Sequence, residues 1–241
     1  MNNPYGIANL WQQGDSVTRT VALVLLVMSV LSWYVMIVKA LGLIRLQRQA
    51  TAAADEFWHS KSMEEGMQKL GSDRNANPFR ALAEDGVNAA RHHAMSRDDL
   101  HGALNVSEWV TSCLRRSVEN ATGLLQGKLQ ILASVGSTAP FVGLFGTVWG
   151  IYHALVGIGV SGQASIDRVA GPVGEALIMT AFGLVVAIPA VLGYNALVRS
   201  NKTMLSRLSN FAHDLHAYLV TGGRVGQPEN VVSLRARGES A

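Results

Sequence analysis

Cysteine is almost absent from this sequence of 241 residues, in which Cys113 is the only one. A single cysteine excludes an intrachain disulfide and leaves no cysteine cluster that could hold a metal. The neighbouring histidines His92 and His93 have no further ligand nearby, so we interpret them as part of a solvated helix face. The sequence also lacks a phosphate-binding glycine loop, a zinc-protease histidine pair and a serine nucleophile elbow. We therefore expect no enzyme, no catalytic residue, no metal and no cofactor.

Charge is also scarce, since charged residues make up 15% of the chain and hydrophobic residues 49%. Two stretches carry no charge at all, 19 residues at 20–38 and 38 residues at 129–166. A third, of 30 residues at 169–198, is interrupted only by Glu175. About 20 apolar residues in a helix cross the hydrocarbon core of a bilayer. The sequence therefore predicts an all-α membrane protein that crosses a lipid bilayer three times.

The boundaries of the three spans follow from charges and glycines. The first run has no basic region before Arg19 and no small-residue cleavage site after it, so we interpret it as an uncleaved helix and not as a signal peptide. Glycines at 157, 159 and 162 predict that the second span leaves the helix before Asp167. The predicted segments are an amino-terminal segment 1–19, spans 20–44, 129–159 and 169–198, a helical domain 45–128, a loop 160–168, and a carboxyl-terminal helix and disordered tail 199–241.

Basic residues predict the orientation, because they are enriched on the cytoplasmic side of membrane helices. They follow the first span, precede the second and follow the third, whereas only Arg19 and Arg168 lie on the opposite side. We therefore expect the amino terminus and the loop 160–168 outside the cytoplasm, and the domain 45–128 and the carboxyl terminus inside it. Anionic lipid at the inner leaflet accounts for the basic pI of about 9.2, so no nucleic-acid partner is expected.

The predicted cytoplasmic parts show helical periodicity. A turn signal at 75–78 separates two helical stretches. After Asp98, apolar residues recur at helical spacing, and no proline interrupts the chain before Pro140, so we expect the second span to extend into the cytoplasm as one long helix. The third span continues into a second apolar stripe until Gly222, after which the composition favours disorder. The members of the two stripes are Leu100, Leu104, Val110, Leu114 and Val118, and Met204, Leu208, Phe211, Leu215 and Leu219.

Small residues form a line along each of the last two spans. On an ideal helix one line runs from Gly136 to Gly157 and the other from Ala176 to Ala190. Small residues let helices approach closely in lipid, so we expect both faces to pack and to join subunits into a homo-oligomer. Thr147 and Thr180 lie on the margins of these lines and could instead bond back to their own helices. The packing residues that we predict are Gly143, Gly146, Gly150, Ala176, Gly183 and Ala187.

Glu175 is the one carboxylate within a predicted span, and a charge there is costly unless it is neutralised or faces protein or water. Desolvation favours the neutral acid, so such a group can load and release a proton near physiological pH. A structural hydrogen bond between helices is the alternative interpretation. Glu175 points about 140° away from Thr180 around an ideal helix, so both cannot face one narrow line. His153 also titrates, and we place it at the outer interface.

Two sequence stretches carry a family resemblance. APFVGLFGTVWG at 139–150 and GPVGEALIMTAFGLVVAIPAVLGYN at 171–195 resemble the MotA/TolQ/ExbB proton-channel family, and PFVGLFGTVWG is most similar to its ExbB members. The specific match covers about a quarter of the chain. By motif, Glu175 in GEAL corresponds to the functional glutamate of the family. Thr147 in FGTVWG and Thr180 in MTAFG correspond to its polar residues of spans two and three.

The resemblance implies a bacterial inner-membrane protein that forms a homopentameric ring around the single helices of an ExbD-like partner. It further implies that the ring couples proton flow, through Glu175, Thr147, Thr180 and an aspartate of the partner, to a TonB-like protein and outer-membrane transport. Two alternatives stay open, a TolQ-like subunit for envelope maintenance and a passive membrane scaffold. The scaffold predicts that Glu175 matters only for folding.

Overall fold

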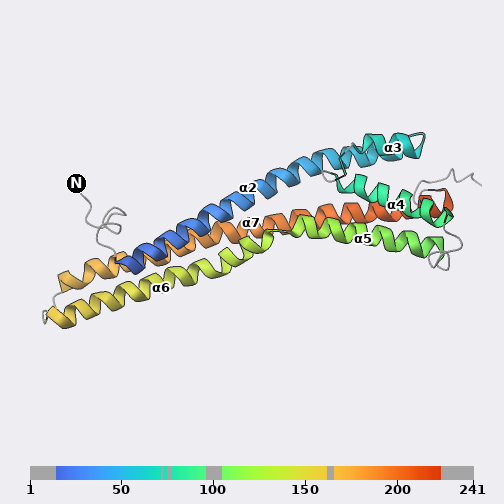
Figure 1. The fold of residues 1–241 in the computed structure, drawn as a ribbon. Helices are drawn as coiled ribbons and strands as arrows, with labels where there is room; N and C mark the ends of the chain where they lie inside the picture. Colours follow the sequence, from blue (N-terminus) through green and yellow to red (C-terminus); the bar gives the residue numbers. More distant parts are fainter. Residues whose placement is uncertain (1–14, 72, 75–76, 96–104, 162–165, 224–241) are drawn as a thin grey trace, which may run out of the picture. The chain divides into compact units, whose positions relative to one another are not determined.

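The computed structural model describes residues 15–71, 73–74, 77–95, 105–161 and 166–223, and these residues contain six helices and no strand (Figure 1). The helices are α2 (Ser16–Trp58), α3 (Met63–Lys69), α4 (Pro78–Met95), α5 (Val106–Gln126), α6 (Leu129–Ser161) and α7 (Ile166–Thr221). Three of them are long and apolar enough to cross a membrane, at Ser16–Arg48, Leu129–Val160 and Gly171–Thr221. For the part of the chain that the structure describes, the all-α class and the three candidate spans are confirmed.

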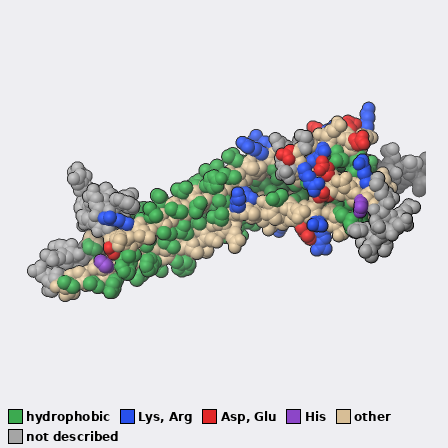
Figure 2. Space-filling view, viewed as in Figure 1, with side chains coloured by type: hydrophobic (Ala, Val, Ile, Leu, Met, Phe, Trp, Pro, Cys, Tyr) green, Lys and Arg blue, Asp and Glu red, His purple; other side chains and the backbone are tan. Residues whose placement is uncertain are grey.

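The chain divides into two compact units. The first comprises Met1–Arg45 and Leu125–Lys202, and we call it the apolar unit. The second comprises Leu46–Leu124 and Thr203–Ala241, and we call it the charged unit. In Figure 2 hydrophobic side chains cover the visible face of the apolar unit, whereas most acidic and basic side chains lie on the charged unit.

The core of the apolar unit is thin, because three helices pack around few side chains. Val21 and Leu25 of α2 lie against small and medium residues of the other two helices. The remaining buried members of this core are Val135, Ala139, Met179, Val186, Ala187 and Ala190. Many large apolar side chains on all three helices stay exposed, among them Leu26 at 62% and Phe141 at 70%. An exposed apolar surface of this extent is expected of helices surrounded by lipid or by other subunits.

The sequence-based expectation of one continuous helix into the second span is wrong. The helix breaks at Gly127 and Lys128, and Lys128 has a left-handed φ of 68°. The break frees the carbonyl of Leu125, which accepts hydrogen bonds from Lys39 Nζ at 3.2 Å and Asn201 Nδ2 at 2.9 Å. The left-handed conformation of Lys128 costs about 1–2 kcal/mol. The hydrogen bonds from Lys39 and Asn201, which lie on other helices, offset this cost. No proline is needed for this break.

The loop before the third span is shorter than the sequence suggested. Helix α6 continues through Gly157 and Gly159 to Ser161, so these glycines do not end it. Helix α7 already begins at Ile166, inside the predicted loop 160–168. Other predicted features lie outside the described residues, namely the segment 1–14, Leu100, Leu104 and the tail 224–241.

The charged unit has a conventional core, and its two apolar stripes pack as predicted where the structure describes them. Val110 and Leu114 of α5 are buried, as are Met204, Leu208, Phe211 and Leu215 of α7. Rings of α2, α4 and α7 meet around Phe211, whose centroid lies 5.2 Å from Phe57 and 5.3 Å from Phe79. Helix α7 ends at Thr221, and Gly222 follows it with a left-handed φ of 76°.

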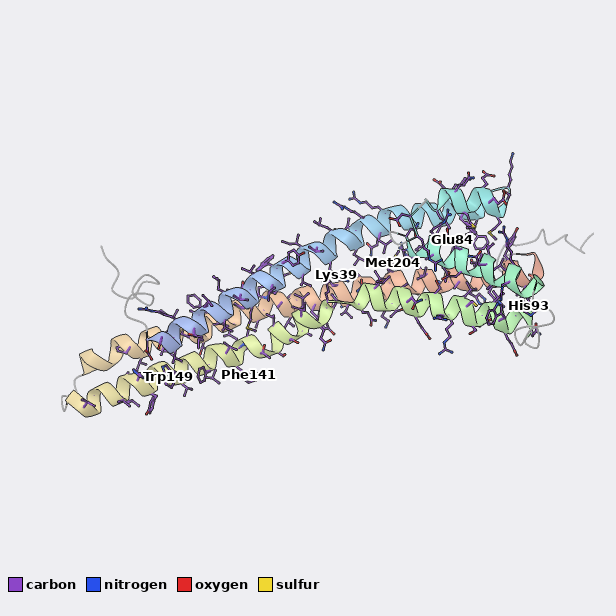
Figure 3. The ribbon with its side chains drawn as sticks, viewed as in Figure 1. Lys39, Glu84, His93, Phe141, Trp149 and Met204 are labelled. Atoms are coloured by element: carbon purple, nitrogen blue, oxygen red, sulfur yellow. The ribbon has the colours of Figure 1, made fainter. Side chains whose placement is uncertain are left out.

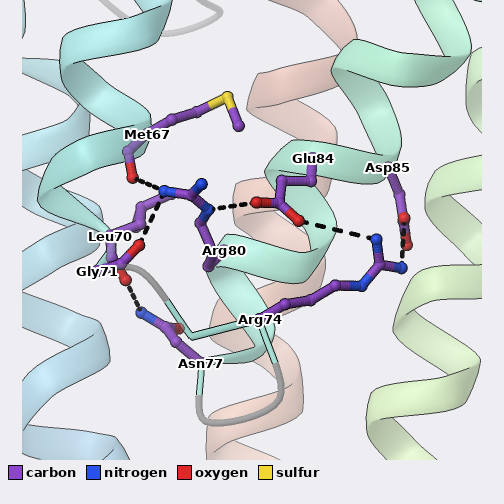
Figure 4. A network of polar contacts seen from close by, with 8 residues as sticks. All are labelled: Met67, Leu70, Gly71, Arg74, Asn77, Arg80, Glu84 and Asp85. Atoms are coloured by element: carbon purple, nitrogen blue, oxygen red, sulfur yellow. Dashed lines mark hydrogen bonds and ion pairs between the residues drawn. The ribbon is translucent and has the colours of Figure 1, made fainter.

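A polar network joins α3 to α4 at the predicted turn (Figure 4). Arg80 donates to the carbonyl oxygens of Met67 and, at 2.8 Å, Gly71, and it pairs with Glu84 at 2.6 Å. Asn77 begins α4, since its side-chain oxygen accepts the backbone N–H of Phe79 at 3.0 Å. Its amide nitrogen also donates to the carbonyl of Leu70 at 2.8 Å. Arg80 and Asn77 therefore satisfy carbonyls at the carboxyl end of α3 that the helix leaves open.

Candidate functional site

The backbones of helices α6 and α7 come close together at two glycines that face each other. A Cβ atom added at Gly143 would lie 2.6 Å from the Met179 carbonyl oxygen and 3.0 Å from the Cα of Gly183. A Cβ atom at Gly183 would lie 2.7 Å from the Ala139 carbonyl oxygen. Only glycine leaves room for this contact of backbone on backbone. The two predicted small-residue lines therefore face each other within one chain.

One turn further along α6, two threonine hydroxyls meet across this interface. Thr147 is 6% exposed, and its Oγ1 hydrogen bonds with Oγ1 of Thr180. The same Thr147 oxygen lies 3.0 Å from the Ala176 carbonyl and 3.2 Å from the Gly143 carbonyl of its own helix. The Thr147 hydroxyl therefore contacts the Gly143 carbonyl of its own helix and also bonds to α7, through the Ala176 carbonyl and Thr180. Since a hydroxyl both donates and accepts, the pair can pass a proton from one oxygen to the next.

Glu175 directly precedes Ala176 in α7, and it is therefore one residue from the carbonyl that Thr147 contacts. Its side chain lies outside the part that the structure describes. On an ideal helix successive residues are turned by about 100°, so Glu175 lies on the flank of this interface and not at its centre. The geometry brings Thr147 and Thr180 together with the backbone beside Glu175.

The other predicted packing residues also make contacts within the chain. A Cβ atom at Gly150 would lie 2.9 Å from Cβ of Ala176, and one at Gly146 would lie 3.1 Å from both Met179 and Val21. Ala187 is 4% exposed in the core of the apolar unit. Gly146 therefore faces α2 as well as α7. Substitutions at these positions disturb the single subunit first, whatever they do to an oligomer.

A second polar contact, which the sequence reasoning missed, joins the start of α2 to α6. Asp15 Oδ1 accepts the backbone N–H of Ser16 at 2.7 Å, and Asp15 Oδ2 accepts Nε1–H of Trp149 at 3.2 Å (Figure 3 labels Trp149). His153 stacks on Trp149, with ring centroids 5.6 Å apart, and its Nε2 lies 4.0 Å from Asp15. The hydrogen bonds from Ser16 and Trp149 hold the pKa of Asp15 below its ordinary value. An aspartate directly before an apolar run signals the start of a helix, but it does not indicate a partner on another helix.

Comparisons with known proteins agree on one family. A family model described as the MotA/TolQ/ExbB proton channel family matches residues 74–210. A protein named biopolymer transport protein ExbB from Xanthomonas campestris pv. campestris (strain B100) is 43% identical over 216 residues, 88% of this chain and 85% of that protein. A protein of the same name from Neisseria meningitidis (strain MC58) is 39% identical over 212 residues, 88% of this chain and 96% of that protein. A protein named Tol-Pal system protein TolQ from Pseudomonas aeruginosa is 34% identical over 217 residues, 88% of this chain and 91% of that protein.

Proposed function

This chain belongs to the MotA/TolQ/ExbB proton channel family, and on that premise we propose that it is the proton-channel subunit that couples the proton motive force to TonB-dependent outer-membrane transport. The two ExbB proteins described above share 43% and 39% of aligned residues with it, whereas the TolQ protein shares 34%. The higher identity over the same 88% of the chain supports the biopolymer-transport role over the Tol-Pal role.

The observation that carries the proposal is the threonine pair beside Glu175, in which Thr147 is buried and Thr180 is half-buried. Thr147, Thr180 and the Ala176 carbonyl form a continuous set of polar atoms inside an otherwise apolar helix pair. A membrane protein keeps such groups in its interior at a cost, and they commonly mark an ion or proton pathway. Glu175 supplies the titratable group, and the hydroxyls orient and relay the proton. No covalent step is needed.

The remaining parts of the proposal concern assembly. The exposed apolar faces of α2, α6 and α7 suit a homopentameric ring within the bacterial inner membrane, with the amino terminus in the periplasm. A single-span ExbD-like partner inside the ring would supply the second carboxylate, since Glu175 is the only one in these spans. Proton transfer between the two carboxylates would move the partner helix, and this motion would act on a TonB-like protein.

Complementation tests the assignment directly. We would express the chain with its ExbD-like and TonB-like partners in cells that lack their own energising subunits. The proposal expects recovery of uptake that an uncoupler abolishes, without recovery of the detergent resistance that a Tol-Pal subunit would restore. Recovery of detergent resistance alone would overturn the TonB assignment.

Threonine variants test the pathway against the passive scaffold. Thr147→Val and Thr180→Val keep the shape of the side chain and remove the hydroxyl. We expect both to reduce energised uptake at normal expression, whereas Thr122→Val in α5, which removes a hydroxyl bonded to its own helix, leaves uptake unchanged. Full uptake in both span variants would support the scaffold instead.

A further inference from the structure

Polar side chains lie exposed on one side of α6, in the half of the span that begins at Leu129. They are Gln130, Ser134, Ser137 and Thr138, and we call them the polar stripe. Their spacing places all four within about 100° around an ideal helix. Phe141 continues the same line and is 70% exposed, so the stripe becomes apolar there (Figure 3).

Helix α2 shows the opposite arrangement over a comparable depth. Between Val21 and Val38 every exposed residue is apolar or aromatic, for example Leu26, Val30 and Leu31. Of the two serines in that stretch, Ser32 is only 1% exposed and Ser29 is half-buried. The exposed face of α2 therefore suits lipid, whereas the polar stripe of α6 does not.

Internal hydrogen bonds satisfy only part of the stripe. Ser137 and Thr138 both donate back to the Ser134 carbonyl, at 3.1 and 2.7 Å. These bonds use the hydroxyl protons and leave oxygen lone pairs facing outward, and the Gln130 amide offers further donors and acceptors. Hydrocarbon offers none of these groups a partner, whereas water does. On the facing helix, Val191 of α7 contacts Gly136. Asn195, which is exposed, lies one turn further along α7, toward the end of the span that contains Gln130.

We propose that the polar stripe faces water, as the lining of a cytoplasmic outlet enclosed by copies of this chain. This inference rests on the proposed function, because it requires a membrane-spanning ring that conducts protons. The stripe lies at the end of the span that carries Lys39 and Lys128, which is the cytoplasmic end by the distribution of basic residues. Phe141 marks the limit of the water, since an apolar ring of such residues excludes it.

The outlet does not continue directly into the threonine pair. Thr147 faces α7, about 120° around α6 from the middle of the stripe. A proton at Thr147 therefore reaches the outlet only through a carrier outside this chain, which suits a moving carboxylate of the partner helix. The stripe would receive the proton after that movement and pass it to cytoplasmic water.

Thiol accessibility tests the outlet in the assembled complex. Ser134→Cys and Ser137→Cys are near-isosteric changes, made with Cys113→Ser and treated with a charged, membrane-impermeant methanethiosulfonate in inverted and right-side-out vesicles. Val30→Cys is the control of matched depth. Val30 lies midway along α2 between Val21, which contacts Gly146, and Lys39, which bonds to Leu125. Ser137 lies near the middle of the segment from Leu125 to Gly146, at a comparable depth.

The reagent attacks thiolate, which forms where water reaches the thiol. We expect both stripe cysteines to react from the cytoplasmic side at least about tenfold faster than the Val30 variant, equivalent to a difference of one pKa unit in the thiol. Equal rates at the stripe and at the control, or labelling only from the periplasmic side, would overturn the outlet. Uncoupler-sensitive uptake, measured on the same unlabelled variants, reports on the proposed function separately.

Discussion

Replacing Gly143 by alanine is the most informative test of the α6–α7 interface. The new Cβ atom would lie 2.6 Å from the Met179 carbonyl oxygen and 3.0 Å from the Gly183 Cα. Both are backbone atoms, so no side-chain rotation relieves the contact. An ordinary carbon–oxygen contact lies at about 3.3 Å or more, and the helices must therefore separate by roughly 0.7 Å.

The cost of that separation can be estimated. A gap of about 0.5–1 Å forfeits roughly a quarter to a half of each van der Waals contact that it opens. Overpacked sites of this kind cost about 1–3 kcal/mol. Alanine recovers about 0.5–1 kcal/mol through its better helix propensity. We expect a net loss of stability, together with a weaker bond from Thr147 to the Ala176 carbonyl, which the same separation lengthens.

Thermal unfolding of the purified complex in detergent measures the effect, at roughly 2–4 °C per kcal/mol for a chain of this size. Gly157→Ala is the matched control, because nothing lies within 4 Å of a Cβ atom there. It should keep or raise the melting temperature. If Gly143→Ala and Gly157→Ala melt at the same temperature, the close approach of α6 and α7 does not exist as described.

Three further predictions concern the rest of the chain. In a variant without Cys113, a cysteine at Gln12 should react with an impermeant reagent from the periplasm and one at Ser60 should not; the reverse pattern would invert the topology. Arg80→Met in α4 removes the hydrogen bonds to the carboxyl end of α3, which costs about 1–3 kcal/mol, so proteolysis between residues 62 and 78 should become faster. Arg91→Met, at an exposed position of α4, should leave the rate unchanged, and equal rates in the two variants would contradict a stabilising role of the Arg80 network. Because hydrogen bonds lower the pKa of Asp15, its contribution is present above the ordinary value of about 4 and is lost as pH falls through the lower folded value. Hydrogen exchange in the first turn of α2 should therefore quicken at acid pH, and Asp15→Asn should show no such transition; an unchanged acid transition in that variant would assign it to another group.

The three spans could be predicted from the sequence because lipid imposes a simple rule on length and charge. The packed face of each span could also be predicted, since glycine spacing at Gly143 and Gly183 follows the helix period. The contact of Thr147 with Thr180 could not, because it depends on the register between two helices as well as on the face of each. Thr147 and Thr180 lie on the margins of the small-residue faces of α6 and α7, and they are neighbours only in the particular register in which these two faces pack.

The helix break before α6 could not be predicted from the local sequence. Locally, Gly127 and Lys128 do not demand a break, and a continuous helix would satisfy the Leu125 carbonyl by itself. The break is favoured by Lys39 and Asn201, which lie far away in sequence and donate to that carbonyl. Tertiary donors of this kind leave no local signal. Asp15 and Trp149 were missed for the same reason, since 134 residues separate them.

Uptake driven by the proton motive force in a Glu175→Gln variant tests the central claim most directly. Glutamine keeps the size and hydrogen-bonding capacity of the side chain but cannot exchange a proton, whereas Glu175→Asp keeps the acid with a shorter reach. We predict that the Gln variant assembles with the ExbD-like partner at normal levels and supports no energised uptake, and that the Asp variant retains part of it. Full uncoupler-sensitive uptake by the Gln variant would contradict the account, because these spans would then contain no titratable carboxylate to carry the proton.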